Sequence, residues 1–428
     1  MQKTLSERDQ AVIWHPYTQM QTAPAPVGIV RGEGALLYDE AGNSHLDATS
    51  SWWVNIHGHA HPYITEKLAQ QAAQLHHCIF AGYTHEPAVQ LAEKLLPILP
   101  GQQQKLFYSD NGSTAVEVAM KMSIQYWHNK GEKRNRLLAF RNAYHGDTFG
   151  AMSVSARSVF TRAFDDYLFT VSFLDLPEPG NIDRLLADID AVARDTAAFI
   201  FEPLIQGAGG MVMYDAALLD RLLQHCRSRN ILLIADEIMT GFGRTGTNFA
   251  MEQVTTAPDM ITLSKGLTGG TIAMGITTCT NDIYNAFLSS DKMKTLFHGH
   301  SFTANPLSCA IALASLDLFL RPECRENRER IAARHRQFAI ELAYHDDVKN
   351  VRTLGTIVAF EVITGEADSY INDLSGFLRS FFAEKRVMLR PLGNTLYILP
   401  PYCITDAQLD EVYTSIMDML AAYGEKWG

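Results

Sequence analysis

Two polar residues each follow a short apolar run of strand length. Asp236 follows Ile231–Ala235, and Lys265 comes shortly after Met260–Leu263. In open α/β sheets, ligands bind at the carboxyl ends of the strands, so we expect both side chains to face one crevice. A lysine can form a Schiff base with pyridoxal phosphate, and a carboxylate can pair with its pyridinium nitrogen. The two residues therefore predict a pyridoxal-phosphate site in which Lys265 and Asp236 are catalytic.

The expected attraction between the Asp236 carboxylate and the ring nitrogen is large enough to keep that nitrogen protonated. Opposite unit charges about 4 Å apart attract by about 4 kcal/mol at an effective dielectric constant of about 20. At about 1.4 kcal/mol per pKa unit, the Asp236 carboxylate would raise the pKa of the ring nitrogen by about three units. The alternative is a buried aspartate that caps a turn and a solvated surface lysine. The placement of both residues after strands favours the cofactor site.

A third strand ends in small polar residues. The run 105–109 is followed by Asp110 and Asn111, then by Gly112, Ser113 and Thr114, which open the helical run AVEVAMKMSIQYW. The first N–H groups of a helix are free and lie at the positive end of its dipole, so they bind phosphate well. Gly112 lets the backbone approach a ligand, and Ser113 adds a hydroxyl donor. A plain helix N-cap is the alternative, but the lysine and aspartate favour a phosphate cradle.

A competing motif lies in the same part of the chain. Gly241–Gly246 reads G-x-G-x-x-G after a strand, and Asp259 lies beyond it. A dinucleotide site needs a helix that begins at these glycines. The following residues, TNFAMEQVTTAPD, are rich in threonine and are interrupted by Pro258, so we expect no long helix there. A nicotinamide or flavin site is therefore disfavoured.

Three alternating histidines raise the question of a metal. His57, His59 and His61 are spaced like ligands on one face of a strand. A tetrahedral zinc site needs at least one more ligand or a water molecule. No cysteine or acidic partner lies nearby in the sequence, so we expect hydrogen-bonding loop residues and no metal.

The composition describes a large enzyme-like chain. It has 428 residues, of which 47% are hydrophobic and 19% are charged, and this is enough for a large core and two domains. The net charge is −11 without a Lys/Arg-rich block, so we expect no nucleic-acid partner. We find no apolar run long enough to span a bilayer and no secretory signal at the N-terminus. The six scattered cysteines predict reduced thiols and a cytoplasmic location.

Strand and helix patterns alternate between residues 105 and 280. Expected strands are 105–109, 136–140, 198–202, 231–235 and 260–263, and expected helices include 86–99, 115–127, 181–194 and 214–229. This alternation predicts an α/β fold with a mostly parallel sheet and helices on both faces. After Pro322 the pattern changes to that of a smaller α+β domain. We predict that residues 1–50 contribute to the small domain, that 51–318 form the large cofactor-binding domain, and that 319–428 complete the small domain.

Several motifs together resemble class III aminotransferases of the fold-type I pyridoxal-phosphate superfamily. They are LLIADEIMTGFGRTG, LSKGLTGG, DNGSTAVEVAMKM, FRNAYHGDTFGAMS and FEPLIQGAGG, and the resemblance extends over nearly the whole chain. It implies a central sheet of seven strands and pyridoxal 5′-phosphate as cofactor. IWHPYTQM, the SSWW segment and RPLGNTLYILPPY resemble the biotin-pathway branch of the class. That resemblance implies transamination of 8-amino-7-oxononanoate to 7,8-diaminononanoate, with S-adenosylmethionine as the expected amino donor.

The resemblance also implies residue roles. Lys265 would be the Schiff-base lysine and proton shuttle, and Asp236 the pyridinium partner. The implied cofactor-binding residues are Gly112, Ser113, Tyr144, Asp236, Ile238, Lys265 and Ser301. Of these, Tyr144 and Ile238 would pack on opposite faces of the ring, and Ser301 would come from the other subunit of a homodimer. The implied substrate-binding residues are Tyr17, Trp52, Tyr144, Arg244, Lys265, Gly299, Arg390 and Tyr397, with Tyr17 also counted as catalytic and Arg390 as the carboxylate-binding group.

Two residues depart from the common pattern of the class. Ala208 stands where many glutamate-using members carry a glutamate that pairs with the substrate-binding arginine. This argues against an ordinary ornithine or 4-aminobutyrate enzyme. Ser301 stands where some members have threonine, and a serine keeps the hydroxyl donor. Four alternatives stay open: lysine as the amino donor, another ω-amino acid aminotransferase of the class, an aminomutase, and a cofactor-binding regulator without catalysis.

Overall fold

The computed structural model describes residues 3–364 and 373–427. Its largest sheet has seven strands in the order β4-β12-β11-β10-β7-β5-β6. The strands are β4 (Lys105–Ser109), β12 (Gly275–Cys279), β11 (Met260–Leu263), β10 (Leu232–Asp236), β7 (Thr196–Phe201), β5 (Arg136–Phe140) and β6 (Val171–Leu174). β12 pairs antiparallel with β11 and β4, whereas the other pairings are parallel. The expected mostly parallel seven-stranded sheet is confirmed.

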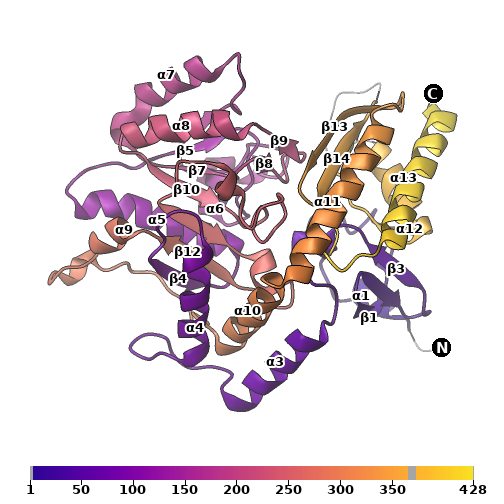
Figure 1. The fold of residues 1–428 in the computed structure, drawn as a ribbon, viewed down its shortest axis with the longest axis horizontal. Helices are drawn as coiled ribbons and strands as arrows, with labels where there is room; N and C mark the ends of the chain where they lie inside the picture. The colour runs from indigo at the N-terminus through magenta and orange to yellow at the C-terminus, as the bar shows by residue number, and fades with distance from the viewer. Residues whose placement is uncertain (1–2, 365–372, 428) are drawn as a thin grey trace.

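Alternate residues along the strands pack into two different cores. In β10, Leu233 and Ala235 belong to a core that includes α4 (Glu86–Leu95), α7 (Ile182–Val192), α8 (Ala216–Ser228) and α10 (Pro306–Phe319). Leu232 and Ile234 belong to a second core, built mainly with α5 (Gly112–Asn129). This period of two places apolar side chains on both faces of the sheet, so both faces need helical cover. The expected helices on both faces are therefore present (Figure 1).

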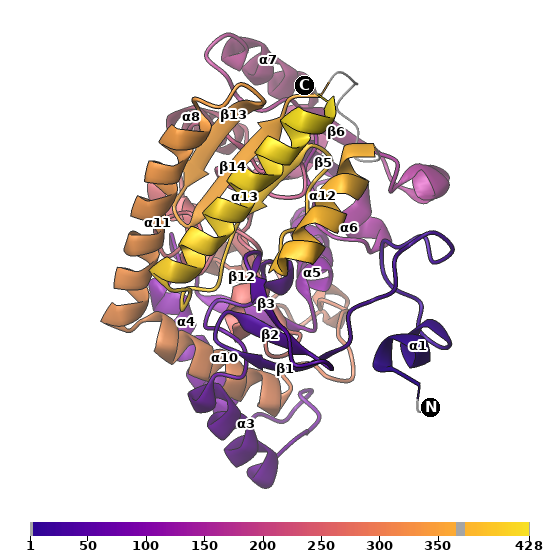
Figure 2. The ribbon, with the colours of Figure 1, turned by 90° about the vertical axis from the view of Figure 1, so that its right-hand side faces the viewer.

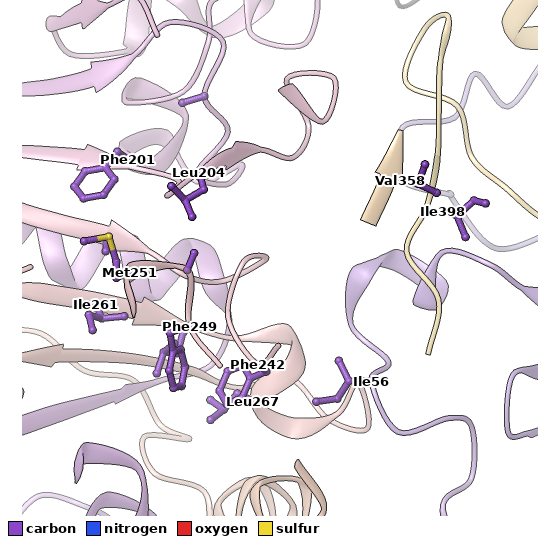
Figure 3. Close-up of a cluster of buried hydrophobic side chains, with 14 of the residues drawn as sticks. Ile56, Phe201, Leu204, Phe242, Phe249, Met251, Ile261, Leu267, Val358 and Ile398 are labelled. Atoms are coloured by element: carbon purple, nitrogen blue, oxygen red, sulfur yellow. The ribbon is translucent and has the colours of Figure 1, made fainter. Parts of the chain in front are cut away.

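The larger of these cores extends beyond the sheet. Figure 3 shows Ile261 and Phe249 near Phe242, with Val358 and Ile398 placed on the C-terminal strands of the same cluster. All five side chains are almost completely buried. At about 25 cal/mol per Å² of apolar surface, burial of such residues is the main stabilising contribution. The large sheet and the C-terminal strands therefore share one continuous core.

Two smaller sheets complete the fold. A three-stranded sheet has the order β13 (Val348–Leu354), β14 (Ile357–Val362) and β16 (Thr395–Ile398). Beside it lie α11 (Pro322–Leu342), α12 (Asp373–Lys385) and α13 (Asp406–Trp427) (Figures 1 and 2). A four-stranded sheet has the order β1 (Ile29–Glu33), β2 (Leu36–Asp39), β3 (Ser44–Asp47) and β15 (Val387–Met388). β15 pairs with β3, so a C-terminal strand joins the N-terminal segment. The boundaries at residues 50 and 318 stay a prediction.

Several element boundaries differ from those expected; for example, β7 covers Thr196–Phe201 and not 198–202, and α8 covers Ala216–Ser228 and not 214–229. The helix predicted at 86–99 ends at Leu95 and continues as a short 3-10 turn, Leu96–Ile98. Pro97 explains the change, because proline has no N–H for an α-helical hydrogen bond. β10 includes Asp236 as its last residue, one position later than expected. Among the described residues, no helix combines the length and apolarity needed to cross a bilayer.

Candidate active site

A cavity of about 870 Å³ lies at the carboxyl ends of several strands of the large sheet. Its walls come from seven separate parts of the chain. They include Tyr17, Trp52, Trp53, Asn142, Tyr144, Asp147, Phe160, Ala208, Gly209, Val212, Lys265, Glu361, Arg390 and Tyr397. A single cavity thus collects residues from the N-terminal segment, the large sheet and the C-terminal strands.

Lys265 reaches this cavity from the end of β11. It begins a short 3-10 turn, Lys265–Thr268, and its backbone is left-handed with φ +45°. Burial lowers the pKa of its amine to about 8, while the carboxylates of Asp236 and Glu202 oppose the shift. The amine lies 4.7 Å from the centroid of the Trp53 ring. A substantial fraction of the amine is therefore neutral near physiological pH and able to act as a nucleophile or base.

Asp236 is held in a fixed orientation beside β11, the strand that precedes Lys265. Its Oδ2 atom lies 2.7 Å from Nδ1 of His145. Its Oδ1 atom accepts the backbone N–H of Ile238 at 3.1 Å and the hydroxyl of Thr262 at 3.3 Å. Only 3% of the residue is exposed. A buried carboxylate with its geometry fixed by three neighbours suits a partner for a ring cation.

The turn between β4 and α5 has the properties of an anion site. Asn111 caps the helix, because its side chain accepts the N–H of Thr114 at 2.9 Å and the Thr114 hydroxyl accepts the Asn111 N–H at 3.2 Å. A Cβ atom on Gly112 would lie 3.0 Å from the Ile238 side chain. A glycine at this position therefore avoids a tight contact with Ile238 at the start of α5, where the first helical N–H groups can bind an anion.

Ser113 follows Gly112 in the same turn between β4 and α5. Its hydroxyl accepts the backbone N–H of Asp147 at 3.3 Å. Gly146 packs so closely that a Cβ there would come within 2.1 Å of the same hydroxyl, and its φ of +131° is strained for other residues. The turn after β4 and the segment after β5 are thus fitted together, with the free N–H groups of α5 at their junction.

Tyr144 and Tyr17 converge on one carboxylate. The Tyr144 hydroxyl donates to Oδ2 of Asp147 at 3.1 Å, and the Tyr17 hydroxyl donates to the same atom. Burial raises the pKa of Tyr144, so it remains a neutral donor. The Tyr17 ring makes edge contacts with Trp52 and Phe160 at centroid distances of 5.8 and 5.7 Å. These contacts build an aromatic wall at the entrance of the cavity.

Arg390 lines the same cavity and stacks on Trp52, the ring that Tyr17 also contacts. Its guanidinium carbon is 4.4 Å from the centroid of the Trp52 ring, an arrangement that favours a cation. Tyr397 is buried and its hydroxyl accepts the indole N–H of Trp53 at 2.9 Å. A forked guanidinium next to aromatic surface can bind a carboxylate at the end of an apolar chain.

Seven residues that were expected in the site do not line this cavity: Gly112, Ser113, Asp236, Ile238, Arg244, Gly299 and Ser301. Arg244 is only 1% exposed, and it donates to the carbonyl oxygens of Pro400 at 2.8 Å and Asn55 at 3.4 Å. The expectation that it contacts the substrate is therefore not supported, because its guanidinium joins two buried backbone segments instead. Gly299 and Ser301 lie on the segment before α10, and Ser301 is exposed. In a single chain, neither reaches the cavity lined by Lys265.

Sequence reasoning assigned no role to three residues of the site. Asp147 joins the two tyrosines, and His145 contacts Asp236. Glu202 is buried, and its carboxylate accepts the N–H groups of Tyr144 and Gly207, both at 3.0 Å. Burial raises the pKa of Glu202 to about 7, with His145 opposing the shift. All three follow a strand of the large sheet, which is the signal that could have identified them.

The glycine-rich motif and the alternating histidines both have structural roles. The glycines at 241–246 form turns, and only a 3-10 turn, Ala250–Gln253, follows them, so the expected absence of a long helix is confirmed. His57 contacts the Ser315 hydroxyl at 3.1 Å, and His59 contacts Oδ2 of Asp47 at 2.9 Å. Within residues 3–364 and 373–427, no group of three or more His, Cys, Asp or Glu side chains is arranged to hold a metal ion.

The residues present fit pyridoxal phosphate. The open cradle at Gly112 would receive the phosphate, the fixed Asp236 carboxylate would face the ring nitrogen, and the buried Lys265 amine would meet the aldehyde. Tyr144 lies on the cavity wall, and Ile238 packs against the cradle. The donor set includes an anion site, a carboxylate and an amine, which match the three polar parts of this cofactor.

Comparison with known proteins agrees with this assignment. The profile of the aminotransferase class-III family matches residues 17–420. An adenosylmethionine-8-amino-7-oxononanoate aminotransferase from Synechococcus elongatus is 48% identical, over 95% of this chain and 98% of the relative. The enzyme of the same name from Geobacter sulfurreducens is 39% identical, over 95% of each chain.

Solved structures give the same result. The adenosylmethionine-8-amino-7-oxononanoate aminotransferase from Methanocaldococcus jannaschii has a TM-score of 0.92 and 34% identity, covering 97% of this chain and 98% of the other. A PMP-bound aminotransferase from Vibrio fluvialis has a TM-score of 0.92 and 25% identity, with 100% of both chains covered. These matches confirm the expected fold-type I architecture. The chain belongs to the class III aminotransferase family, whose members use pyridoxal phosphate.

Proposed function

We propose that this protein transfers an amino group to the ketone of 8-amino-7-oxononanoate and forms 7,8-diaminononanoate for biotin synthesis, with S-adenosylmethionine as the donor. The observation that carries the proposal is the cavity, in which the buried Lys265 amine and the Arg390 guanidinium share one aromatic-walled space. Relatives at 48% and 39% identity over nearly their full length carry the name of this reaction. The substrate has the matching parts, a reactive ketone, an apolar chain and a carboxylate.

Lys265 moves the proton in this proposal. When bound, pyridoxal phosphate supplies an electron sink for the carbanion that proton removal leaves on the amino donor. The neutral Lys265 amine takes the proton from the donor carbon, holds it as an ammonium group, and returns it on the other side of the transferred nitrogen. Its pKa of about 8 suits both steps near neutral pH, because neither the protonated nor the neutral form is rare.

The other residues bind and orient the reactants. Asp236 holds a positive charge on the ring nitrogen, with His145 fixing the carboxylate. Arg390 binds the substrate carboxylate, and Tyr17 and Trp52 pack against the aliphatic chain.

Ala208 supports a substrate with a distal carboxylate. It lies in the wall of the same cavity as Arg390. The resemblance to the class places a glutamate at this position in many members that use glutamate. An alanine there leaves the guanidinium free of that competing carboxylate. Arg390 can then bind the long-chain acid in the acceptor half-reaction without first breaking an ion pair.

A homodimer completes the site in this proposal. Ser301 and Gly299 do not line the cavity of their own chain, and in this proposal Ser301 contacts the phosphate from a second subunit. All six cysteines are free thiols in the structure. This agrees with a cytoplasmic enzyme, because reducing conditions keep thiols unpaired there.

The alternatives differ in substrate, donor or reaction. A TM-score of 0.91 also relates the chain to an ω transaminase from Pseudomonas jessenii at 25% identity, so the fold alone does not select the substrate. Lysine could replace S-adenosylmethionine as the donor. An aminomutase would convert one substrate without a keto partner.

Half-reaction spectra test the proposal. We expect S-adenosylmethionine to remove the visible absorption band of the lysine-bound cofactor, and 8-amino-7-oxononanoate to restore it. Bleaching by lysine alone would change the donor and keep the acceptor. Failure of the keto acid to restore the band, with recovery by pyruvate, would refute the assignment in favour of an ω-amino acid enzyme. Turnover of one substrate with no keto partner would indicate an aminomutase.

A further inference from the structure

One wall of the active-site cavity is a glycine-rich hairpin. Its two strands are β8 (Ile205–Gln206) and β9 (Val212–Met213), which pair antiparallel. Ala208, Gly209 and Gly210 in the connecting turn line the cavity, as does Val212. With almost no side chains on this wall, the position of its backbone sets the width of the cavity.

The backbone of this hairpin is strained at its tip. Gly210 has φ +103° and Met211 has φ +53°, and a left-handed conformation is uncommon for a methionine. Such conformations persist only where surrounding contacts hold them. Met211 is completely buried in a small cluster that includes Ile205 and Tyr397. Apolar packing therefore holds the Met211 side chain. A second group holds the backbone carbonyl oxygens of Gly210 and Met211.

That second group is the guanidinium of Arg352, which lies on β13 in a different sheet. Its Nε donates to the carbonyl oxygen of Met211 at 2.8 Å, and its Nη2 donates to that of Gly210 at 2.5 Å. Its Nη1 donates to the Asn350 carbonyl oxygen at 2.5 Å and to Oε1 of Glu361 at 3.1 Å. One planar group thus uses all three nitrogens and joins the hairpin to the three-stranded sheet.

Glu361 extends this connection to the cavity itself. It lies on β14, lines the cavity, and also accepts the side-chain amide of Asn350 at 2.9 Å. The Arg352 and Glu361 side chains are only 15% and 17% exposed. Burial lowers the pKa of Arg352, and Glu361 opposes the shift, so the ion pair is shielded from water. In the same sheet, Glu361 pairs with Thr395 on β16, the strand that carries Tyr397.

We infer that Arg352 is a positioning residue for the acceptor half-reaction. It fixes the hairpin wall at Ala208–Gly210 relative to the three-stranded sheet, whose strand β16 carries Tyr397. Arg390 lies between β15 and β16 and lines the same cavity. The wall and the carboxylate-binding end of the cavity therefore keep a constant separation, which suits a long-chain acid that must reach both Lys265 and Arg390. This inference rests on the proposed function only for the identity of that acid.

The test compares Arg352→Ala and Arg352→Lys in the holoenzyme with Arg136→Ala as the matched control. Arg136 also makes a half-buried ion pair, to Asp195 at 3.1 Å, but it does not line the cavity. We expect Arg352→Ala to raise KM for 8-amino-7-oxononanoate by about tenfold and to change kcat by less than about threefold, since binding and not chemistry loses its alignment. Arg352→Lys should give a smaller increase, because one ammonium group cannot reproduce the forked contacts.

Hydrogen exchange provides a readout that is independent of the substrate. The Met211 N–H donates to the Gly207 carbonyl oxygen at 2.9 Å, and exchange of a peptide covering 203–214 should accelerate in Arg352→Ala and not in Arg136→Ala. If the wild-type enzyme does not use the keto acid, the proposed function fails, while this exchange measurement still tests the contact. Unchanged exchange in both Arg352 variants would overturn the inference.

A double variant separates loss of alignment from an unpaired charge. Removing Arg352 leaves the Glu361 carboxylate at the cavity wall, where it would repel the substrate carboxylate. We expect Arg352→Ala/Glu361→Gln to keep the raised KM and the fast exchange, because the hairpin remains unsupported. Recovery of the wild-type KM in this double variant would overturn the inference and assign the effect to electrostatic repulsion by Glu361.

Discussion

Nδ1 of His145 lies 2.7 Å from Oδ2 of Asp236, and both side chains are almost completely shielded from solvent. The histidine follows β5 and the aspartate ends β10, so the large sheet brings the two together. The contact fixes the rotation of the carboxylate, whose other oxygen is held by Ile238 and Thr262. The group that would stabilise a ring cation is thus positioned before any cofactor binds.

Replacing Asp236 with asparagine should remove the charge and keep the shape. We expect Asp236→Asn to lower kcat by about 100-fold or more, because the ring nitrogen loses the partner that keeps it protonated. The pKa of Lys265 should also fall below about 8, since the Asp236 carboxylate raises it in the wild type. The maximal kcat measures the first effect. The position of the limbs of the pH–rate profile measures the shift in pKa. Asp220→Asn, at a surface carboxylate bonded to Thr255 and Thr256, is the control. Wild-type kcat in Asp236→Asn would contradict the assigned role.

The lowered pKa of Lys265 predicts how stability depends on pH. The folded cofactor-free protein loses this proton near pH 8, whereas the unfolded chain keeps it until about pH 10.5. Between these values the unfolded chain binds more protons, so the free energy of unfolding should rise with pH, by about 3 kcal/mol in total. Urea unfolding across this range should show a shallower rise for Lys265→Met. Identical pH dependence in the two proteins would mean that the lysine is not desolvated.

Arg390 should control affinity for the acid. We expect Arg390→Met to raise KM for 8-amino-7-oxononanoate by about 10- to 100-fold, because the variant loses a charge-assisted contact with the carboxylate. Steady-state kinetics with this acid and with an analogue lacking the carboxylate measure the effect. The analogue should be insensitive to the substitution. Arg386→Met changes a nearby exposed arginine and should leave both KM values unchanged.

Ala208 allows a test of the same Arg390 contact by adding a carboxylate that competes with the substrate. We expect Ala208→Glu to raise KM for 8-amino-7-oxononanoate by about tenfold, because the new carboxylate competes for Arg390. Ala208→Gln has nearly the same volume without the charge and should have a smaller effect. Equal KM values in the two variants would show that bulk, and not an ion pair, limits binding at this wall.

Hybrid dimers test the shared site. We expect Lys265→Ala and Ser301→Asp proteins to be nearly inactive alone, the first without its base and the second with a charge that repels phosphate. If Ser301 acts across a dimer interface, mixed subunits contain one site with neither change, and activity should return on co-refolding. Activity that stays absent in a mixture shown to contain hybrid dimers would place Ser301 outside the partner's site.

The sequence alone was enough to predict Asp236 and Lys265 as the principal chemical residues. Asp236 and Lys265 could be found because each follows an apolar run of strand length, and parallel strands deliver their carboxyl ends to one edge of a sheet. The turn at Gly112 could be found for the same reason. The alternation of elements between residues 105 and 280 determined the sheet and its helical cover.

Only the tertiary structure decided which distant groups meet. Arg244 and Arg390 are both arginines in polar motifs, yet one binds buried carbonyl groups and the other lines the cavity. The contacts of Arg352 with the carbonyls of Gly210 and Met211 have no local signal either. The physical reason is that periodicity reports which face of an element is buried, whereas a guanidinium bonds to whichever acceptors the packed elements bring within about 3 Å.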